Sequence, residues 1–222
     1  MTTFTPEARQ NLEHYLATHD LPTGMGTEES ACSLAAINLA MTGELKDDIP
    51  DCMSRVLGKA VISLQDAMPD EMRNSERYKQ WLPHAAGTGR DLERERLAVL
   101  MDWMWGTVLP KIQPLADKKG FGSEWSEMCE KRTFVAARAA ARAAADALAF
   151  TLADAAADAA AYAAHAALAA DSADSAAYAA TTYAAYATYA ARYASHADPN
   201  MFWRDIDPIG VLERMTFLGE NQ

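Results

Sequence analysis

The sequence predicts an all-α protein, a helical bundle in which two long alanine-rich antiparallel helices pack on a smaller helical N-terminal region. Alanine, the residue with the highest helix propensity, makes up 35 of the 62 residues from Ala136 to Ala197. No glycine or proline occurs between Gly122 and Pro199, so nothing in that stretch breaks a helix. Upstream, apolar residues recur three and four positions apart, which is the spacing of one helix face.

Capping residues, glycines and prolines divide the first half of the chain into short helices. Thr5 and Thr27 are expected to cap the first two helices, and Gly43 and Pro69 to end the second and third. The stretch from Pro83 to Arg90 contains two glycines and is expected to form a turn. The helices expected from these signals span residues 6–19, 28–42, 54–67, 70–81 and 92–104.

The connection to the alanine-rich part is predicted from prolines and a cap. Pro110 and Pro114 indicate a kinked connector, and Ser123 is expected to cap the long helical region that follows. Unbroken to Ala197, that region would be about 110 Å long at 1.5 Å per residue. A break at 171–175, where Asp and Ser cluster, gives two antiparallel helices instead, and a continuous rod is the alternative.

The change in composition predicts two regions. One is a helical N-terminal region over 1–122, and the other, over 123–222, is the alanine-rich hairpin with a closing helix over 208–218 that Asp207 caps. One continuous domain is the alternative. The tyrosines from Tyr178 to Tyr193 form a stripe that is either core or an exposed binding surface.

Charge and cysteine content exclude several classes of partner and site. The formal net charge is −11, from 31 acidic and 20 basic residues, which argues against direct nucleic-acid binding. Three widely spaced cysteines without a C-x-x-C pair predict neither a disulfide scaffold nor a zinc site. No secretory signal is expected. No membrane-spanning segment is expected either, because the longest uncharged alanine-rich run, over 175–191, is too polar. A cytoplasmic location is therefore predicted.

Motifs that carry enzymatic or metal chemistry are missing from the sequence. No histidine has a glutamate three residues before it, and H-E-x-x-H does not occur, so neither a metal nor a cofactor is expected. The glycine-rich turn over 87–90 lacks the Lys-Ser/Thr ending of a phosphate-binding loop and is predicted to be an ordinary interhelical turn. The sequence therefore favours a non-enzymatic role.

The candidate functional residues fall into two sets. Carboxylates in a loop and on a helix face are predicted to contact a basic protein partner, such as a nucleic-acid-binding protein or complex. These are Glu44, Asp47, Asp48, Asp51, Asp146, Asp154 and Asp158. The alternative is a small-ligand or active-site pocket near the 83–90 turn and the Trp-rich helix. Its residues are His84, Arg90, Asp102 and Trp103. A self-assembling homo-oligomer is the third hypothesis.

Six strings of the sequence carry a resemblance to an uncharacterised family of phage, prophage and bacterial proteins with an alanine-rich helical tail. They are ACSLAAINLAMTGEL (31–45), IPDCMS (49–54), QDAMPDEMRNS (65–75), LPHAAGTGR (82–90), LMDWMWGTVLP (100–110) and FWRDIDPIGVLERM (202–215). More distantly, the chain looks like immunity proteins of the Imm-5-like kind. The resemblance transfers no catalytic residue. It implies a protein that binds and blocks another protein, as an anti-CRISPR-like inhibitor of a bacterial defence complex or as an immunity protein.

Overall fold

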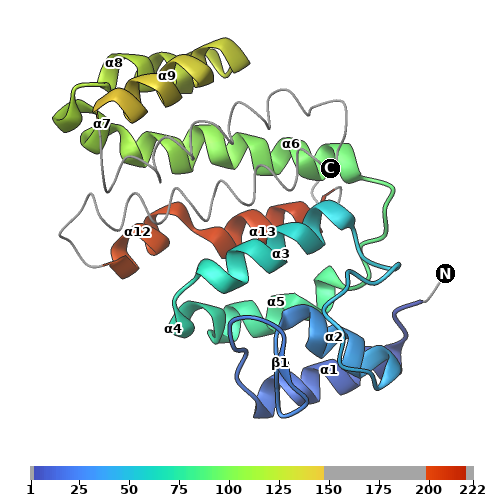
Figure 1. The fold of residues 1–222 in the computed structure, drawn as a ribbon. Coiled ribbons are helices and arrows are strands. Elements are labelled where there is room, and N and C mark those ends of the chain that lie inside the picture. Colours follow the sequence, from blue (N-terminus) through green and yellow to red (C-terminus); the bar gives the residue numbers. More distant parts are fainter. Residues whose placement is uncertain (1–2, 148–198, 219–222) are drawn as a thin grey trace. The chain divides into compact units, whose positions relative to one another are not determined.

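The computed structural model describes residues 3–147 and 199–218, and these are helical apart from turns, loops and one very short hairpin (Figure 1). The predicted all-α fold class is confirmed. The chain divides into two compact units, of which unit 1 comprises Met1–Arg96 and Ile209–Gln222 and unit 2 comprises Leu97–Pro208. The break expected at 171–175 and the tyrosine stripe lie outside the described residues.

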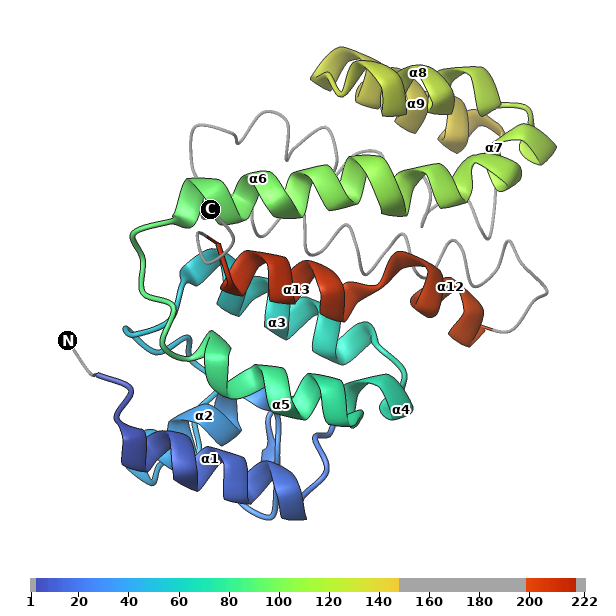
Figure 2. The same cartoon turned by 180° about the vertical axis from the view of Figure 1, so that it is seen from behind.

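Unit 1 is built from short helices around a buried apolar core. Helix α1 begins at its predicted cap, where Thr5 Oγ1 accepts a hydrogen bond from the amide of Ala8 at 3.1 Å. Helix α1 packs against α2 and α5, and α2 packs against α3, as Figures 1 and 2 show. The helices are α1 (Pro6–Thr18), α2 (Ser33–Thr42), α3 (Arg55–Ala67), α4 (Asp70–Arg73), α5 (Glu76–Ala85) and α13 (Pro208–Thr216).

The predicted start of the second helix at Glu28 is wrong. The chain there forms an antiparallel hairpin of β1 (Gly26–Thr27) and β2 (Ser30–Ala31), and α2 starts only after Cys32. The amide of Ala31 donates to the hydroxyl of Tyr15 on α1 at 2.7 Å, so a partner distant in sequence replaces the bonds of a first helical turn. The predicted end is confirmed, because Gly43 follows α2 in the left-handed conformation, with φ 74°.

The helix predicted over 70–81 is broken in two. Helix α4 ends at Arg73, and Ser75 caps α5 by accepting a hydrogen bond from the amide of Tyr78. Between them, Asn74 leaves the helical conformation and binds the backbone of Leu21 through its side chain. The turn predicted over 83–90 also starts too early, because α5 continues past Pro83.

The first part of unit 2 is helical without the predicted break. Helix α6 (Glu93–Trp103) starts in unit 1 and runs through a π turn (Met104–Val108) and a 3₁₀ turn (Leu109–Ile112) into α7 (Gln113–Lys119). The stretch around Pro110 and Pro114, expected to be a kinked connector, is therefore helical up to Lys119. Pro110 and Pro114 each lie in the first turn of a short helix, where no backbone donor is needed.

The alanine-rich region begins with two helices instead of one. Helix α8 (Gly122–Lys131) ends at Arg132, whose φ is 51°, and α9 (Phe134–Ala147) follows. The predicted cap at Ser123 is wrong, because its hydroxyl donates to the carboxylate of Glu124 and Phe121 precedes the helix. Along α9, Ala137, Ala140 and Ala144 are buried.

The closing segment contains one helix that was not predicted. Helix α12 (Pro199–Ile206) precedes α13, and the backbone carbonyl of Ile206 accepts a hydrogen bond from the indole of Trp103 at 2.5 Å. The closing helix after Asp207 is confirmed as α13, which ends at Thr216.

Candidate functional site

Two exposed apolar side chains of unit 1 border one small cavity. Met25, in the loop before the hairpin, is 43% exposed, and Ile62, on α3, is 41% exposed. Both line a cavity of about 50 Å³, together with the buried residues Cys32 and Leu34. Met25 and Ile62 therefore provide a small exposed apolar surface at the border of this cavity.

Two carboxylates line the same cavity. Oδ1 of Asp66 accepts hydrogen bonds from the amide of Gly24 at 2.9 Å and from Gln65 Nε2 at 3.5 Å. Within the part of the chain that the structure describes, no lysine or arginine forms an ion pair with Asp66 or with Asp47. Burial raises the pKa of the Cys32 thiol, and the negative charges of Asp47 and Asp66 raise it further. The cavity is therefore apolar inside and negatively charged at its border. We call Met25, Ile62, Asp47 and Asp66 the Met25–Ile62 face.

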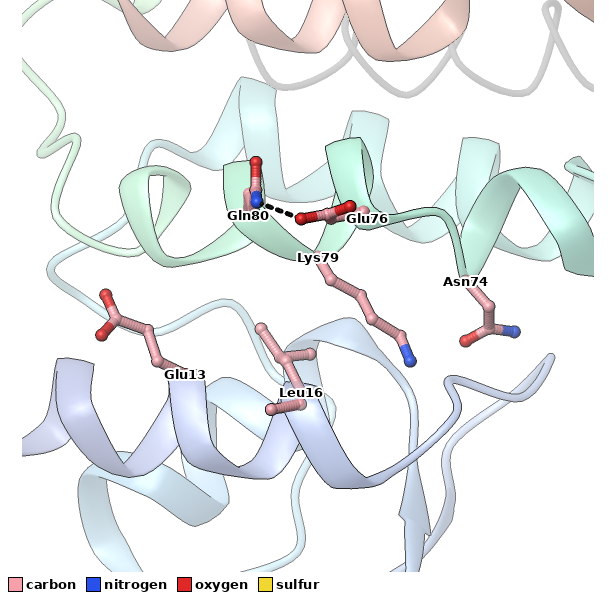
Figure 3. A pocket seen from close by; sticks show the side chains of 7 residues that line it. Glu13, Leu16, Asn74, Glu76, Lys79 and Gln80 are labelled. Atoms are coloured by element: carbon pink, nitrogen blue, oxygen red, sulfur yellow. Dashed lines mark hydrogen bonds between the residues drawn. The ribbon is translucent and has the colours of Figure 1, made fainter.

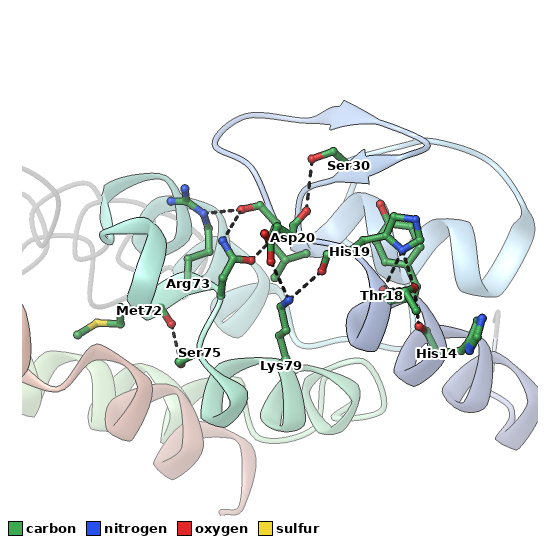
Figure 4. A network of polar contacts seen from close by, with 12 residues as sticks. His14, Thr18, His19, Asp20, Ser30, Met72, Arg73, Ser75 and Lys79 are labelled. Carbon is green, nitrogen blue, oxygen red and sulfur yellow. Dashed lines mark hydrogen bonds and ion pairs between the residues drawn. The ribbon is translucent and has the colours of Figure 1, made fainter.

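Side chains from α3, α4 and α5 hold the loop that carries Met25. Figure 4 shows Arg73, Lys79 and Ser30 converging on the segment around Asp20. The bonds to backbone atoms of this loop, donor first, are Lys79 Nζ to His19 O (2.8 Å), Arg73 Nε to Leu21 O (2.8 Å), Leu21 N to Asn74 Oδ1 (2.7 Å), Gln65 Nε2 to Pro22 O (3.0 Å) and Gly24 N to Asp66 Oδ1 (2.9 Å). The loop thus has a defined conformation although little of it is regular secondary structure.

Arg73 connects this loop to the C-terminal end of α3. Its guanidinium is buried and donates to the carbonyls of Gln65 and Met68 at 2.8 and 2.9 Å. The carbonyl of Gln65 lacks its usual helical donor, because the residue four positions later is Pro69. A cation at the C-terminal end of a helix also interacts favourably with the helix dipole. The same side chain therefore stabilises both α3 and the loop.

The structure brings only Asp47 of the predicted loop carboxylates to the Met25–Ile62 face. Glu44 pairs with Lys46, and a hydrogen bond from this ammonium lowers the pKa of Glu44. Asp51 pairs with Arg90 at 2.9 Å. Asp48 is exposed, and its backbone carbonyl accepts a hydrogen bond from the side chain of Asn38. On α9, Asp146 is exposed, and Asp154 and Asp158 lie outside the described residues.

Each residue of the alternative pocket has a partner of its own. Arg90 pairs with Asp51, Asp102 pairs with Arg132 at 3.1 Å, and the buried Trp103 donates to Ile206. The ring of His84 packs edge-on against Phe217, with 5.3 Å between ring centroids. His84 also lines a cavity of about 520 Å³ between α5 and the end of α13, with Arg77, Trp81 and Glu213 among its other lining residues.

A further cavity of about 420 Å³ is lined by residues of α1 and α5. In Figure 3, Glu13 and Leu16 of α1 face Glu76 and Lys79 of α5. Its polar groups are already engaged: Lys79 donates to the carboxylate of Asp20 at 3.0 Å, and Glu76 accepts a hydrogen bond from Gln80. These pairs leave few free polar groups to orient a ligand.

Of the described residues, no group of three or more His, Cys, Asp or Glu side chains is placed to hold a metal ion. None of the described helices combines the length and apolar character that crossing a membrane requires. No protein-family model, curated protein or solved structure matches this chain.

The sequence also contained signals for the two apolar residues of the face, Met25 and Ile62. The core-facing stripe of α3 follows Val56, Leu57, Ala60, Val61 and Leu64, which are all buried. Ile62 falls outside this stripe, so an apolar residue on the solvent side of α3 was detectable. Met25 stands between two glycines in a turn, which is also an unusual place for a large apolar residue.

Proposed function

We propose that the protein is a non-enzymatic, acidic, helical protein-binding protein, and that the Met25–Ile62 face is its contact surface. The observation that carries this proposal is the exposure of Met25 and Ile62 on a fixed loop and helix, beside two carboxylates that form no ion pair within the described part of the chain. Interfaces combine an apolar centre with polar groups at the rim, and methionine is enriched in them. A preformed surface also loses less conformational entropy on binding.

The charge of the chain favours a basic partner. A net charge of −11 steers a positively charged protein towards the surface and speeds association. The resemblance to phage and immunity-type proteins is consistent with a partner that is blocked on binding, such as a nucleic-acid-binding component of a bacterial defence complex. In that case the acidic face would occupy a basic surface that otherwise binds phosphates.

Affinity capture from a bacterial lysate tests the proposal, with the full-length chain and the variants Met25→Ser and Asp47→Lys as baits. Both substitutions are at exposed positions, so they should leave the fold intact. Glu95→Lys is the matched control, because Glu95 is an exposed carboxylate of α6 that does not line the cavity.

We expect a stoichiometric protein partner that the wild type and Glu95→Lys hold at low salt and release at high salt. The two face variants should recover at least about tenfold less of it, which corresponds to about 1.4 kcal/mol of binding free energy. Equal recovery on face variants and wild type, or no partner at either salt concentration, would contradict the proposal.

Small-ligand binding is the second candidate function, and one observation favours it. The cavity that His84 lines, between α5 and the end of α13, has a volume of about 520 Å³ and lies within the range of about 300–1,000 Å³ found for ligand pockets. Trp81 and Phe217 supply aromatic surface there. A fragment screen by ligand-detected NMR tests it, with Trp81→Leu and His84→Ala expected to remove the hits.

A further inference from the structure

Resting on the proposed function, we propose that the Met25–Ile62 face accepts the side chain of a lysine of the partner protein. The aliphatic stem of the lysine packs on Met25 and Ile62, and its ammonium lies between the carboxylates of Asp47 and Asp66. The occupant follows from the size of the cavity, from its lining and from its charge.

The cavity is too small for a free organic ligand. Its volume of about 50 Å³ compares with about 300–1,000 Å³ for pockets that enclose drug-sized molecules. It accommodates the end of one extended side chain. Apolar walls from Met25, Cys32 and Ile62 suit a chain of methylene groups, and the carboxylates suit a cation at its tip. Lysine combines these two properties in one side chain.

The hydrogen bonds of Asp66 favour an ammonium over a guanidinium. Oδ1 of Asp66 already accepts from the amide of Gly24 and from Gln65, so only one oxygen of this carboxylate is fully open. Arginine binds best when both oxygens of a carboxylate accept its parallel N–H groups. The ammonium of lysine is a compact charge with three donors, and it can serve single oxygens of two different carboxylates.

Within the residues that the structure describes, no cation of the protein itself pairs with the two carboxylates of the face. Asp47 and Asp66 form no ion pair with any lysine or arginine of the described residues, and Lys46 of the same loop pairs with Glu44. Two carboxylates around one cavity repel each other, and a cation placed between them removes this repulsion. A lysine of the partner therefore supplies the charge that the face lacks.

Amide NMR shifts of the ¹⁵N-labelled full-length protein test the inference. The probes are the capped amino acids Nα-acetyl-lysine amide, Nα-acetyl-arginine amide and Nα-acetyl-norleucine amide. Norleucine has the apolar stem of lysine without the charge. We expect the lysine probe to shift the amide signals of Gly24 and Met25 with a Kd at least about tenfold lower than that of norleucine. Arginine should bind more weakly than lysine.

The double variant Asp47→Asn with Asp66→Asn should reduce the lysine affinity to that of norleucine, whereas Glu95→Gln should leave it unchanged. Equal binding of lysine and norleucine, tighter binding of arginine, or no lysine-dependent shift at the highest soluble concentration would overturn the inference.

The outcomes separate the inference from the proposed function. If Met25→Ser and Asp47→Lys lose the captured partner while the lysine probe does not bind, the protein-binding function stands and the lysine assignment falls. If the probe binds but neither variant affects capture, the proposed function falls, and the assignment to a partner lysine falls with it.

Discussion

Replacing Arg73 by methionine should destabilise unit 1 by about 3–5 kcal/mol. Methionine keeps an unbranched apolar stem of similar length and lacks the guanidinium. In the wild type, this group donates to the carbonyls of Leu21, Gln65 and Met68 and pairs with Asp70. The substitution therefore leaves backbone acceptors buried without a donor, a change that is costly because the acceptors themselves remain.

The magnitude follows from these bonds. The carbonyl of Leu21 keeps a donor, Asn74 Nδ2 at 3.3 Å, whereas the carbonyls of Gln65 and Met68 lose the donor that Arg73 supplies. Hydrogen bonds from a charged donor contribute about 1.5–3 kcal/mol each. Two such bonds give about 3–6 kcal/mol, and breaking a buried charged contact on one side costs about 3–5 kcal/mol. A loss of this size is a large part of the 5–15 kcal/mol that stabilises a typical domain.

Native-state hydrogen exchange is the suitable assay, because the chain has two units and a single urea transition would not report on one of them. The amides of Val61 and Leu64 report on α3. Their opening free energy should fall by about 3–5 kcal/mol in Arg73→Met, and by no more than about 0.5 kcal/mol in the control Arg94→Met, which changes an exposed arginine. A loss below about 1 kcal/mol in Arg73→Met would show that Arg73 does not hold α3 and the loop together.

Three further predictions concern other parts of the chain. Gly26→Ala should lower the Tm clearly more than Gly24→Ala, although both glycines have positive φ. The reason is steric, because an added Cβ at Gly26 would lie 1.9 Å from the carbonyl oxygen of Ser30, whereas a Cβ at Gly24 would meet no atom within 4 Å. Similar Tm values would contradict this hairpin geometry. Burial raises the pKa of Cys129 to about 11, above that of an unfolded thiol near 8.5, so its contribution to stability should be complete below about pH 8.5 and decrease as the pH rises to 11. The free energy of unfolding should therefore fall less steeply over this range in Cys129→Ser, and parallel curves would refute the assignment. Trp103→Phe should cost about 1–3 kcal/mol, measured by hydrogen exchange in α12, because it removes the donor to a buried backbone carbonyl; unchanged exchange would show that this bond contributes nothing.

Local signals in the sequence predicted the ends of several helices correctly. Thr5 caps α1 and Gly43 ends α2, as expected from residue type alone. Both features depend on hydrogen bonds between residues three or four positions apart, so a short sequence window contains the necessary information.

The hairpin and the break after α4 depend on distant partners and could not be predicted in this way. Ala31 binds the hydroxyl of Tyr15, and Asn74 binds the backbone of Leu21, 53 positions away. Arg73 presents the same difficulty, because arginine is normally exposed and only the tertiary structure places carbonyl groups around it. At the hairpin and at Asn74, long-range bonds override local helix propensity.

The candidate site was predictable to a similar extent. Of the four loop carboxylates predicted to contact a partner, only Asp47 lines the cavity beside Met25 and Ile62. Glu44, Asp48 and Asp51 do not line it. Asp66 was not among the predicted contact residues, because only the folded loop brings Gly24 to its carboxylate. The composition shows that the chain has an excess of carboxylates. Only the folded structure shows which of the described carboxylates pair with a lysine or arginine of the same chain.

The bonds around residues 19–24 connect the stability of unit 1 to the proposed binding surface. Met25 is exposed, so its own contacts contribute little to folding, yet the loop before it is bound at Leu21, Pro22 and Gly24 by side chains of α3 and α4. Fixing the loop in the free protein lowers the entropy lost when a partner binds. In the proposed binding function, residues such as Arg73, which bind this loop and do not line the cavity, should therefore affect the affinity for a partner through the conformation of the loop.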